Sequence, residues 1–131
     1  MQTILIIDDD EQTRQVLKAA LNAAGYYVFL AESGEAGVRL FRSERVGLVL
    51  VDIWMPGKDG LETIMDIRRA VPEAKIVAMT GAVEANGINA MTWASRLGAK
   101  GFLVKPFSSA ELLGAVVTAL RSEGDMEMTF R

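Results

Sequence analysis

Five short apolar runs are spaced along the chain, and segments of helical periodicity lie between them. The runs occupy residues 4–7, 27–31, 48–51, 75–79 and 101–104. A run with almost no polar interruption is typical of a strand that is covered on both faces, as in a parallel sheet. The run at 48–51 is the most apolar, so we expect it near the centre of the sheet.

The intervening segments carry helix signals. We predict helices over residues 14–24, after Ser33, over 61–70, over about 90–97, and after Ser108. Ser33 can cap the second helix, and Ser108 with Glu111 forms a capping box for the last. Gly81, Asn86 and Gly87 predict a looser region before the fourth helix.

Strands that alternate with helices predict an α/β protein, a doubly wound (βα)5 fold with a five-stranded parallel sheet and helices on both faces. The chain of 131 residues fits one such domain. We place that domain at residues 1–121. Residues 122–131 show no clear period and are expected to be a tail or the start of a linker.

Composition removes several classes of function. The chain contains no cysteine and no histidine, which excludes disulfide scaffolds, thiolate or imidazole zinc sites and histidine general bases. It also cannot be a phosphohistidine donor. The net charge of −3 argues against direct nucleic-acid binding. Neither a membrane span nor a basic leader is visible, so we expect a cytoplasmic protein with no membrane contact.

Chemically distinctive residues stand directly after the predicted strands. Three aspartates, Asp8, Asp9 and Asp10, follow the first strand, and Asp52 follows the third. In an open parallel sheet these ends share one edge. If the two strands are neighbours, their carboxylates converge, which is costly unless a cation joins them. Oxygen ligands favour a hard ion such as Mg²⁺.

Two further strand ends complete a site for a phosphoryl group. Thr80 follows the fourth strand and offers a hydroxyl, and Lys105 follows the fifth and offers a positive charge. Carboxylates, a divalent metal, a lysine and a hydroxyl suit phosphoryl transfer, in which catalysis is mostly positioning and charge stabilisation. A carboxylate can itself be the nucleophile.

Four motifs resemble one family. They are the segments 4–10 (ILIIDDD) and 51–60 (VDIWMPGKDG), the pair Thr80-Gly81, and the segment 104–107 (VKPF). Together they resemble the receiver domain of bacterial two-component response regulators, such as the stand-alone chemotaxis regulator, over roughly residues 3–121. The resemblance implies a flavodoxin-like strand order of 2-1-3-4-5.

The resemblance also implies a role for each site residue. Asp52 is the phosphoacceptor, and Lys105 pairs with its carboxylate and then with the phosphate. Asp9 binds Mg²⁺ directly, Asp8 binds it mainly through water, and the backbone carbonyl of Trp54 is a further ligand.

Further roles concern the response to phosphorylation. Thr80 and Phe102 form the switch pair, and the Lys105–Pro106 peptide is cis. The implied partners are a sensor histidine kinase or a histidine phosphotransfer protein, and an unknown downstream target or a missing C-terminal output domain. The face made by the fourth helix, fifth strand and fifth helix reports the switch. The domain assists its own phosphorylation and dephosphorylation and is otherwise not an enzyme.

Three other functions fit the sequence less well. A flavodoxin-like nucleotide-binding protein needs a phosphate-cradling loop where this chain has aspartates. A haloacid dehalogenase-type hydrolase matches Asp8-x-Asp10 only nominally. A receiver-like interaction module that is never phosphorylated is disfavoured by the complete site. Asp10 and Glu11 we interpret as the first turn of a helix.

Two places depart from the usual pattern of the family. Trp54 is bulky for its position, and our hypothesis is that its indole shields the acyl phosphate from water. The spacing from Thr80 to Lys105 is also longer than is common. The surplus lies around residues 83–89, which puts the fourth helix and the output surface in doubt.

Overall fold

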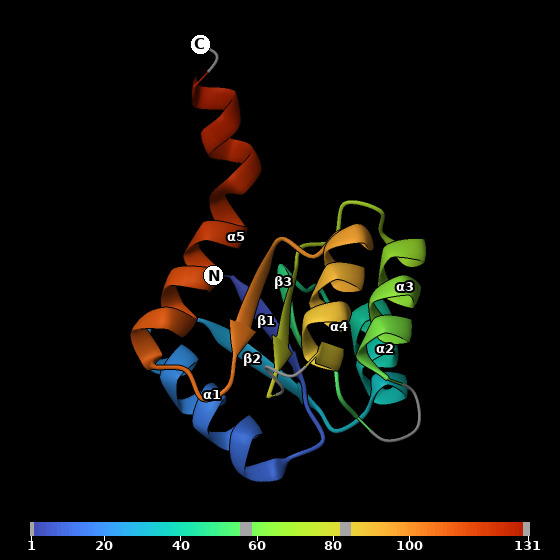
Figure 1. The fold of residues 1–131 in the computed structure, drawn as a ribbon. Coiled ribbons are helices and arrows are strands. Elements are labelled where there is room, and N and C mark those ends of the chain that lie inside the picture. Colours follow the sequence, from blue (N-terminus) through green and yellow to red (C-terminus); the bar gives the residue numbers. More distant parts are fainter. Residues whose placement is uncertain (1, 56–58, 82–84, 130–131) are drawn as a thin grey trace.

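The computed structural model describes residues 2–55, 59–81 and 85–129, of which residues 85–90 and 122–129 are described by their backbone alone. Strands and helices alternate along the chain (Figure 1). The elements are β1 (Thr3–Ile7), α1 (Glu11–Ala23), β2 (Tyr27–Ala31), α2 (Gly34–Ser43), β3 (Leu48–Asp52), α3 (Gly60–Ala70), β4 (Ile76–Thr80), α4 (Ala85–Arg96), β5 (Gly101–Val104) and α5 (Ser109–Thr129).

The strands form one parallel sheet in the order β2-β1-β3-β4-β5. Both the α/β class and the flavodoxin-like order predicted from the sequence are confirmed. β3 is central, and all of its residues are buried. Because β1 and β3 are direct neighbours, with Ile7 opposite Val51, the residues that follow these two strands meet at one edge.

Helices cover both faces of the sheet, with α1 and α5 on one face and α2, α3 and α4 on the other (Figure 1). Successive strand residues point to opposite faces, which explains why the continuous apolar runs are needed. In β1, Leu5 and Ile7 pack toward α2, α3 and α4, while Ile4 and Ile6 pack toward α1 and α5.

The capping residues predicted the start of two helices correctly, and the start of a third was predicted wrongly. Ser33 caps α2 as predicted, accepting a hydrogen bond from the backbone N–H of Ala36 at 3.1 Å. Ser108 and Glu111 make the reciprocal capping box, both hydrogen bonds being 3.0 Å long. The prediction for α4 was wrong at its start, because the helix begins at Ala85 and contains Asn86 and Gly87.

Two predictions concern segments that the structure describes in part. In the 83–89 region, residues 83 and 84 lie outside the described residues, and the rest belong to α4. At the C-terminus, α5 continues past residue 121 to Thr129. The division of the chain at residue 121 stays a prediction. Among the described residues, no helix has the length and apolar character needed to span a membrane.

Candidate functional site

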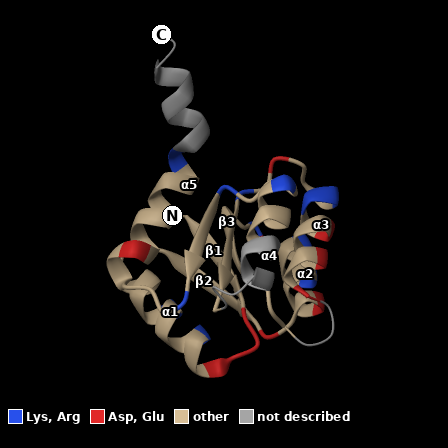
Figure 2. Ribbon diagram, in the orientation of Figure 1, with Lys and Arg blue, Asp and Glu red and all other residues tan. Residues whose placement is uncertain are grey.

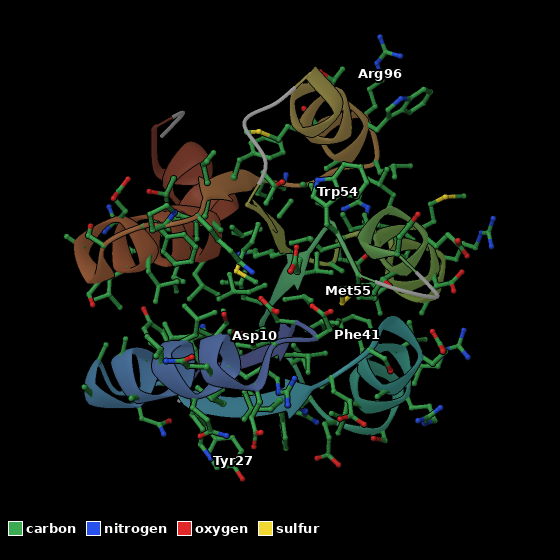
Figure 3. All side chains as sticks on the ribbon, turned by 60° about the horizontal axis from the view of Figure 1, so that its bottom comes forward. Asp10, Tyr27, Phe41, Trp54, Met55 and Arg96 are labelled. Carbon is green, nitrogen blue, oxygen red and sulfur yellow. The ribbon has the colours of Figure 1, made fainter. Side chains whose placement is uncertain are left out.

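The carboxyl ends of the strands bring the predicted site residues to one edge of the sheet. Asp8 directly follows β1, Asp52 ends β3, Thr80 ends β4 and Lys105 directly follows β5. Acidic residues are concentrated at this edge in Figure 2, and Figure 3 looks onto it. The structure therefore joins residues from four strands that are far apart in the sequence.

Lys105 forms ion pairs with two aspartates. Its Nζ atom lies 2.7 Å from Oδ2 of Asp8 and 3.1 Å from Oδ2 of Asp52. The Asp8 side chain is fully buried, that of Asp52 is 8% exposed and that of Lys105 is 24% exposed. A buried carboxylate requires a compensating charge and hydrogen bonds, and Lys105 supplies both to the pair.

The other oxygen of each carboxylate accepts a hydrogen bond from a nearby backbone N–H. Oδ1 of Asp8 accepts from Asp10 N at 3.0 Å, and Oδ1 of Asp52 accepts from Trp54 N at 3.0 Å. This bond to the residue two positions later is the usual turn of an aspartate that leaves a strand. Each carboxylate is thus held at both oxygens, and its orientation is fixed before any ligand arrives.

Burial and charge shift the protonation of the site. Burial raises the pKa of Asp52, and the neighbouring charge of Asp8 raises it further, against the opposing effect of Lys105. For Lys105, burial lowers the pKa, but the hydrogen bond to Asp8 and the charge of Asp52 outweigh burial and leave the pKa raised. The lysine therefore stays charged at neutral pH.

Three carboxylates are placed to hold a cation. One oxygen from each of Asp8, Asp9 and Asp52 lies within 4.8 Å of the others, and Asp9 is exposed whereas Asp8 and Asp52 are buried. An all-oxygen donor set with an open side fits Mg²⁺, which uses one or two carboxylates and keeps several waters. The residues present therefore fit the predicted ion. The backbone carbonyl of Trp54 as a further ligand stays a prediction.

Gly60 closes the loop that carries Asp52. A Cβ atom at this position would lie 2.3 Å from the backbone oxygen of Asp52 and 2.5 Å from Cα of Ile53. The Gly60 N–H donates to the Ile53 carbonyl at 3.1 Å, and Asp59 caps α3 by accepting from Glu62 N at 2.9 Å. The first turn of α3 therefore packs directly on the end of β3, and only glycine allows that approach.

The predicted switch residues lie on the two strands beyond β3. The Thr80 side chain is buried, and its backbone carbonyl accepts a hydrogen bond from Lys105 N at 2.8 Å. Phe102 is partly buried on β5 and lines a shallow groove of about 550 Å³ with residues of α4. The Lys105–Pro106 peptide is cis, as expected. The switching roles of Thr80 and Phe102 stay predictions.

Other residues near the site have plainer explanations or were missed. Asp10 is the N-cap of α1, as interpreted from the sequence, and hydrogen bonds from the Thr13 hydroxyl and backbone lower its pKa. Arg14 was missed; its guanidinium donates to the Asp8 carbonyl at 2.8 Å. Gly60 was not singled out either, although its place after the loop is the signal that could have identified it.

Comparison with known proteins identifies a family. The family described as "Response regulator receiver domain" matches residues 4–117. Among curated relatives, the response regulator MprA of Mycolicibacterium vanbaalenii is 33% identical over 90% of this chain, and the transcriptional regulatory protein CpxR of Klebsiella pneumoniae is 31% identical over 92%. This chain spans about half the length of each, 50% in both cases.

Solved structures agree with the sequence match. The response regulator TrrA of Thermotoga maritima, in complex with Mg²⁺ and BeF, is 34% identical with a TM-score of 0.80, covering 92% of this chain and all of that one. The chemotaxis protein CheY4 of Vibrio cholerae is 27% identical with a TM-score of 0.84, covering 92% of this chain and 99% of that one. Both the flavodoxin-like nucleotide-binding alternative and the hydrolase alternative are disfavoured by these matches.

Proposed function

Because the chain belongs to the response regulator receiver domain family of two-component signal transduction, we propose that it is a switch which accepts a phosphoryl group on Asp52. The observation that carries this assignment is the convergence of Asp8, Asp9, Asp52 and Lys105 at one edge of the sheet. A carboxylate between a lysine and a metal-binding cluster can act as a nucleophile toward phosphorus.

The transfer is a substitution at phosphorus that needs no oxidant or reductant. An oxygen of the Asp52 carboxylate forms a bond to phosphorus while the bond from phosphorus to the donor breaks, and the donor leaves with that electron pair. With acetyl phosphate the leaving group is acetate. With a phosphohistidine it is the imidazole, whose ring takes up one proton from solvent as it leaves. The product is an acyl phosphate on Asp52, and no net oxidation or reduction takes place.

Each charged residue has a distinct part in this step. Asp8 and Asp9, with Asp52, are the residues that would hold Mg²⁺, and the related TrrA forms a complex with Mg²⁺ and BeF. When bound, the ion neutralises negative charge on the phosphoryl oxygens and orients them. Lys105 already forms an ion pair with Asp52. After the transfer its ammonium group can instead pair with an oxygen of the new phosphoryl group.

The same site supplies the switch. Phosphorylation adds roughly −1.5 to −2 charges at neutral pH, and the protein shifts toward the state that best neutralises them. In our proposal the Thr80 hydroxyl moves to the phosphoryl group and Phe102 turns inward. The α4–β5–α5 face, which contains the groove beside Phe102, then presents a changed surface to a downstream target.

The partners follow from the chemistry of the donor. This chain has no histidine, so the phosphohistidine must come from another protein or domain, a sensor histidine kinase or a histidine phosphotransfer protein. The output is a separate protein or a C-terminal domain, in line with the regulators of twice this length that the chain matches.

Intact-mass measurement tests the proposal. The protein is incubated with acetyl phosphate and Mg²⁺ beside an Asp52→Asn variant and a sample treated with a chelator. We expect the mass of one phosphoryl group on the wild-type protein and on neither control. A folded wild-type protein that gains no mass from acetyl phosphate or from a cognate kinase would instead be a receiver-like interaction module.

A further inference from the structure

Arg14, on α1, contacts the backbone of the candidate site although it is not one of the residues that would hold Mg²⁺. Its Nη1 atom donates a hydrogen bond to the backbone carbonyl of Asp8 at 2.8 Å, across six positions in the sequence. Side chains of a helix lean toward its N-terminus, so this long side chain reaches back over the first turn of α1. The hydrogen bond is partly buried, so water competes less for the carbonyl than it would on an open surface.

The turn between β1 and α1 is attached to Arg14 at two points. Besides its side-chain contact with Asp8, Arg14 donates its backbone N–H to the carbonyl of Asp10 at 3.0 Å, which closes the first turn of α1. Asp10, labelled in Figure 3, is also the N-cap of this helix, and its carboxylate accepts hydrogen bonds from the backbone and hydroxyl of Thr13. α1 therefore holds the turn at both of its ends, at Asp8 and at Asp10.

The contact from Arg14 completes the hydrogen bonding of Asp8. The backbone N–H and both carboxylate oxygens of Asp8 are already engaged in hydrogen bonds. The carbonyl oxygen is its remaining polar group, and Arg14 holds it. Among the contacts that the structure describes, the bond from Arg14 is the one that acts on the peptide group joining Asp8 to Asp9.

Asp9 depends on that peptide group for its position. A peptide group is planar, so holding the Asp8 carbonyl oxygen also sets the direction of the Asp9 N–H and the place of the Asp9 Cα atom. The Asp9 side chain is exposed, and no hydrogen bond or ion pair from the described residues holds its carboxylate. One of its oxygens nevertheless lies within 4.8 Å of the facing oxygens of Asp8 and Asp52. The backbone therefore directs Asp9 toward the cluster, and Arg14 holds that backbone.

The charge of Arg14 and its hydrogen bond have opposite effects on a bound cation. A guanidinium stays protonated in proteins, and its positive charge repels Mg²⁺. Charge alone therefore predicts that removing Arg14 tightens Mg²⁺ binding. The hydrogen bond predicts the reverse, because losing a residue that orients metal ligands typically lowers the affinity by roughly 10–100-fold. Since the two effects differ in sign, the Mg²⁺ affinity of an Arg14 variant decides which of them dominates.

We propose that Arg14 is a positioning residue, which holds the Asp8–Asp9 peptide so that the Asp9 carboxylate is directed toward the cluster before Mg²⁺ binds. The inference rests on the proposed function, because it concerns the ion that assists phosphoryl transfer to Asp52. Arg14 itself contacts neither the ion nor the phosphoryl group. Its loss raises the Mg²⁺ concentration that the site needs, and leaves the transfer to Asp52 unchanged once Mg²⁺ is bound.

Titration with Mg²⁺, followed by NMR, tests the proposal without any phosphoryl donor. The backbone amide signals of Asp9 and Asp10 report the ion locally and give a Kd even when binding is weak. Arg14→Met keeps a long apolar side chain but removes both the donor and the charge. We expect its Kd for Mg²⁺ to rise about tenfold, although a positive charge near the site has been removed. Arg14→Lys restores the charge and a donor on a shorter head group, so its Kd should lie between those of Arg14→Met and the wild-type protein.

Arg45→Met is the matched control for the change in charge. Arg45 is exposed in the connection between α2 and β3, at the opposite end of the strands from the site. The variant removes the same charge from the chain and should leave the Kd for Mg²⁺ unchanged. Urea denaturation of each metal-free variant shows whether it is folded at the temperature of the titration. If Arg14→Met does not fold, the raised Kd of Arg14→Lys carries the test.

Phosphorylation by acetyl phosphate separates this inference from the proposed function. Arg14→Met should need about tenfold more Mg²⁺ for half of its maximal rate, and at saturating Mg²⁺ it should reach the wild-type rate. If Arg14→Met weakens Mg²⁺ binding but neither protein is phosphorylated by acetyl phosphate or a cognate kinase, the proposed function fails and the positioning role stands. A Kd of folded Arg14→Met that equals or falls below the wild-type value would overturn the positioning role. So would a wild-type protein whose Asp9 and Asp10 signals do not respond to Mg²⁺.

Discussion

The contact between Gly60 and the end of β3 predicts a specific defect for the variant Gly60→Ala. The added Cβ atom would lie 2.3 Å from the Asp52 backbone oxygen and 2.5 Å from the Ile53 Cα atom. Ordinary contacts between such atoms are about 3.5 Å, so the loop or the helix must move by roughly 1 Å. Both obstructing atoms belong to the backbone of a buried strand end, which cannot rotate away.

The magnitude follows from two opposing effects. Overpacking of this kind costs about 1–3 kcal/mol, and we expect the upper part of that range because backbone must shift. Replacing glycine by alanine also lowers the conformational entropy of the unfolded chain. This effect raises the free energy of unfolding by about 0.4–1 kcal/mol. The free energy of unfolding of Gly60→Ala should therefore fall by about 1–2 kcal/mol.

Gly114→Ala is the matched control. Gly114 is exposed in α5, and a Cβ atom there meets nothing within 4 Å. Because glycine is unfavourable inside a helix, this variant should gain about 0.5–1 kcal/mol. Urea denaturation of both variants beside the wild-type protein makes the comparison, and phosphorylation by acetyl phosphate should be slowed in Gly60→Ala alone. A Gly60→Ala protein as stable as Gly114→Ala would refute the claim that the close packing of Gly60 on the end of β3 holds Asp52 in place.

Further predictions concern the ion, the pH and the phosphoryl lifetime. Mg²⁺ at a hundred times its Kd should raise the free energy of unfolding by about 2.7 kcal/mol. The Asp9→Asn variant, changed at an exposed position, should not be stabilised by Mg²⁺, and its free energy of unfolding without metal should equal that of the wild-type protein. Since the pKa of Asp52 is raised above 3.8, the folded state binds that proton more tightly than the unfolded state. The stability of the wild-type protein relative to Asp52→Asn should therefore fall as pH rises through the raised pKa, and denaturation across pH without Mg²⁺ checks this. Trp54→Ala should lose its phosphoryl group faster, by mass spectrometry over time, and an unchanged rate would remove the shielding hypothesis.

The strands and their chemistry were accessible from the sequence because burial on both faces leaves a strong signal. A run such as residues 4–7 must be apolar throughout when helices cover both sides of the sheet, and the polar residue that ends it marks the edge. This is why Asp8 and Asp52 could be expected to meet once their strands were neighbours. The strand order itself came from the resemblance, since apolar runs do not say which strand lies beside which.

Other features depend on tertiary contacts and leave little local trace. Asn86 and Gly87 favour a turn, yet α4 begins at Ala85. Ala94 in the same helix is buried in the core, and this packing outweighs the local preference. That Arg14 reaches the Asp8 carbonyl depends on how α1 lies on the sheet. The two ion pairs of Lys105, with Asp8 and with Asp52, likewise depend on the register of β1, β3 and β5.

The most direct test of the central claim is to locate the phosphoryl group on the chain. The protein is treated with acetyl phosphate and Mg²⁺, the acyl phosphate is reduced with borohydride to homoserine, and peptide mass spectrometry locates the altered residue. We predict homoserine at position 52 and no change at positions 8, 9 or 10. Modification at one of those aspartates instead, with Asp52 intact, would contradict the assignment of Asp52 as the phosphoacceptor.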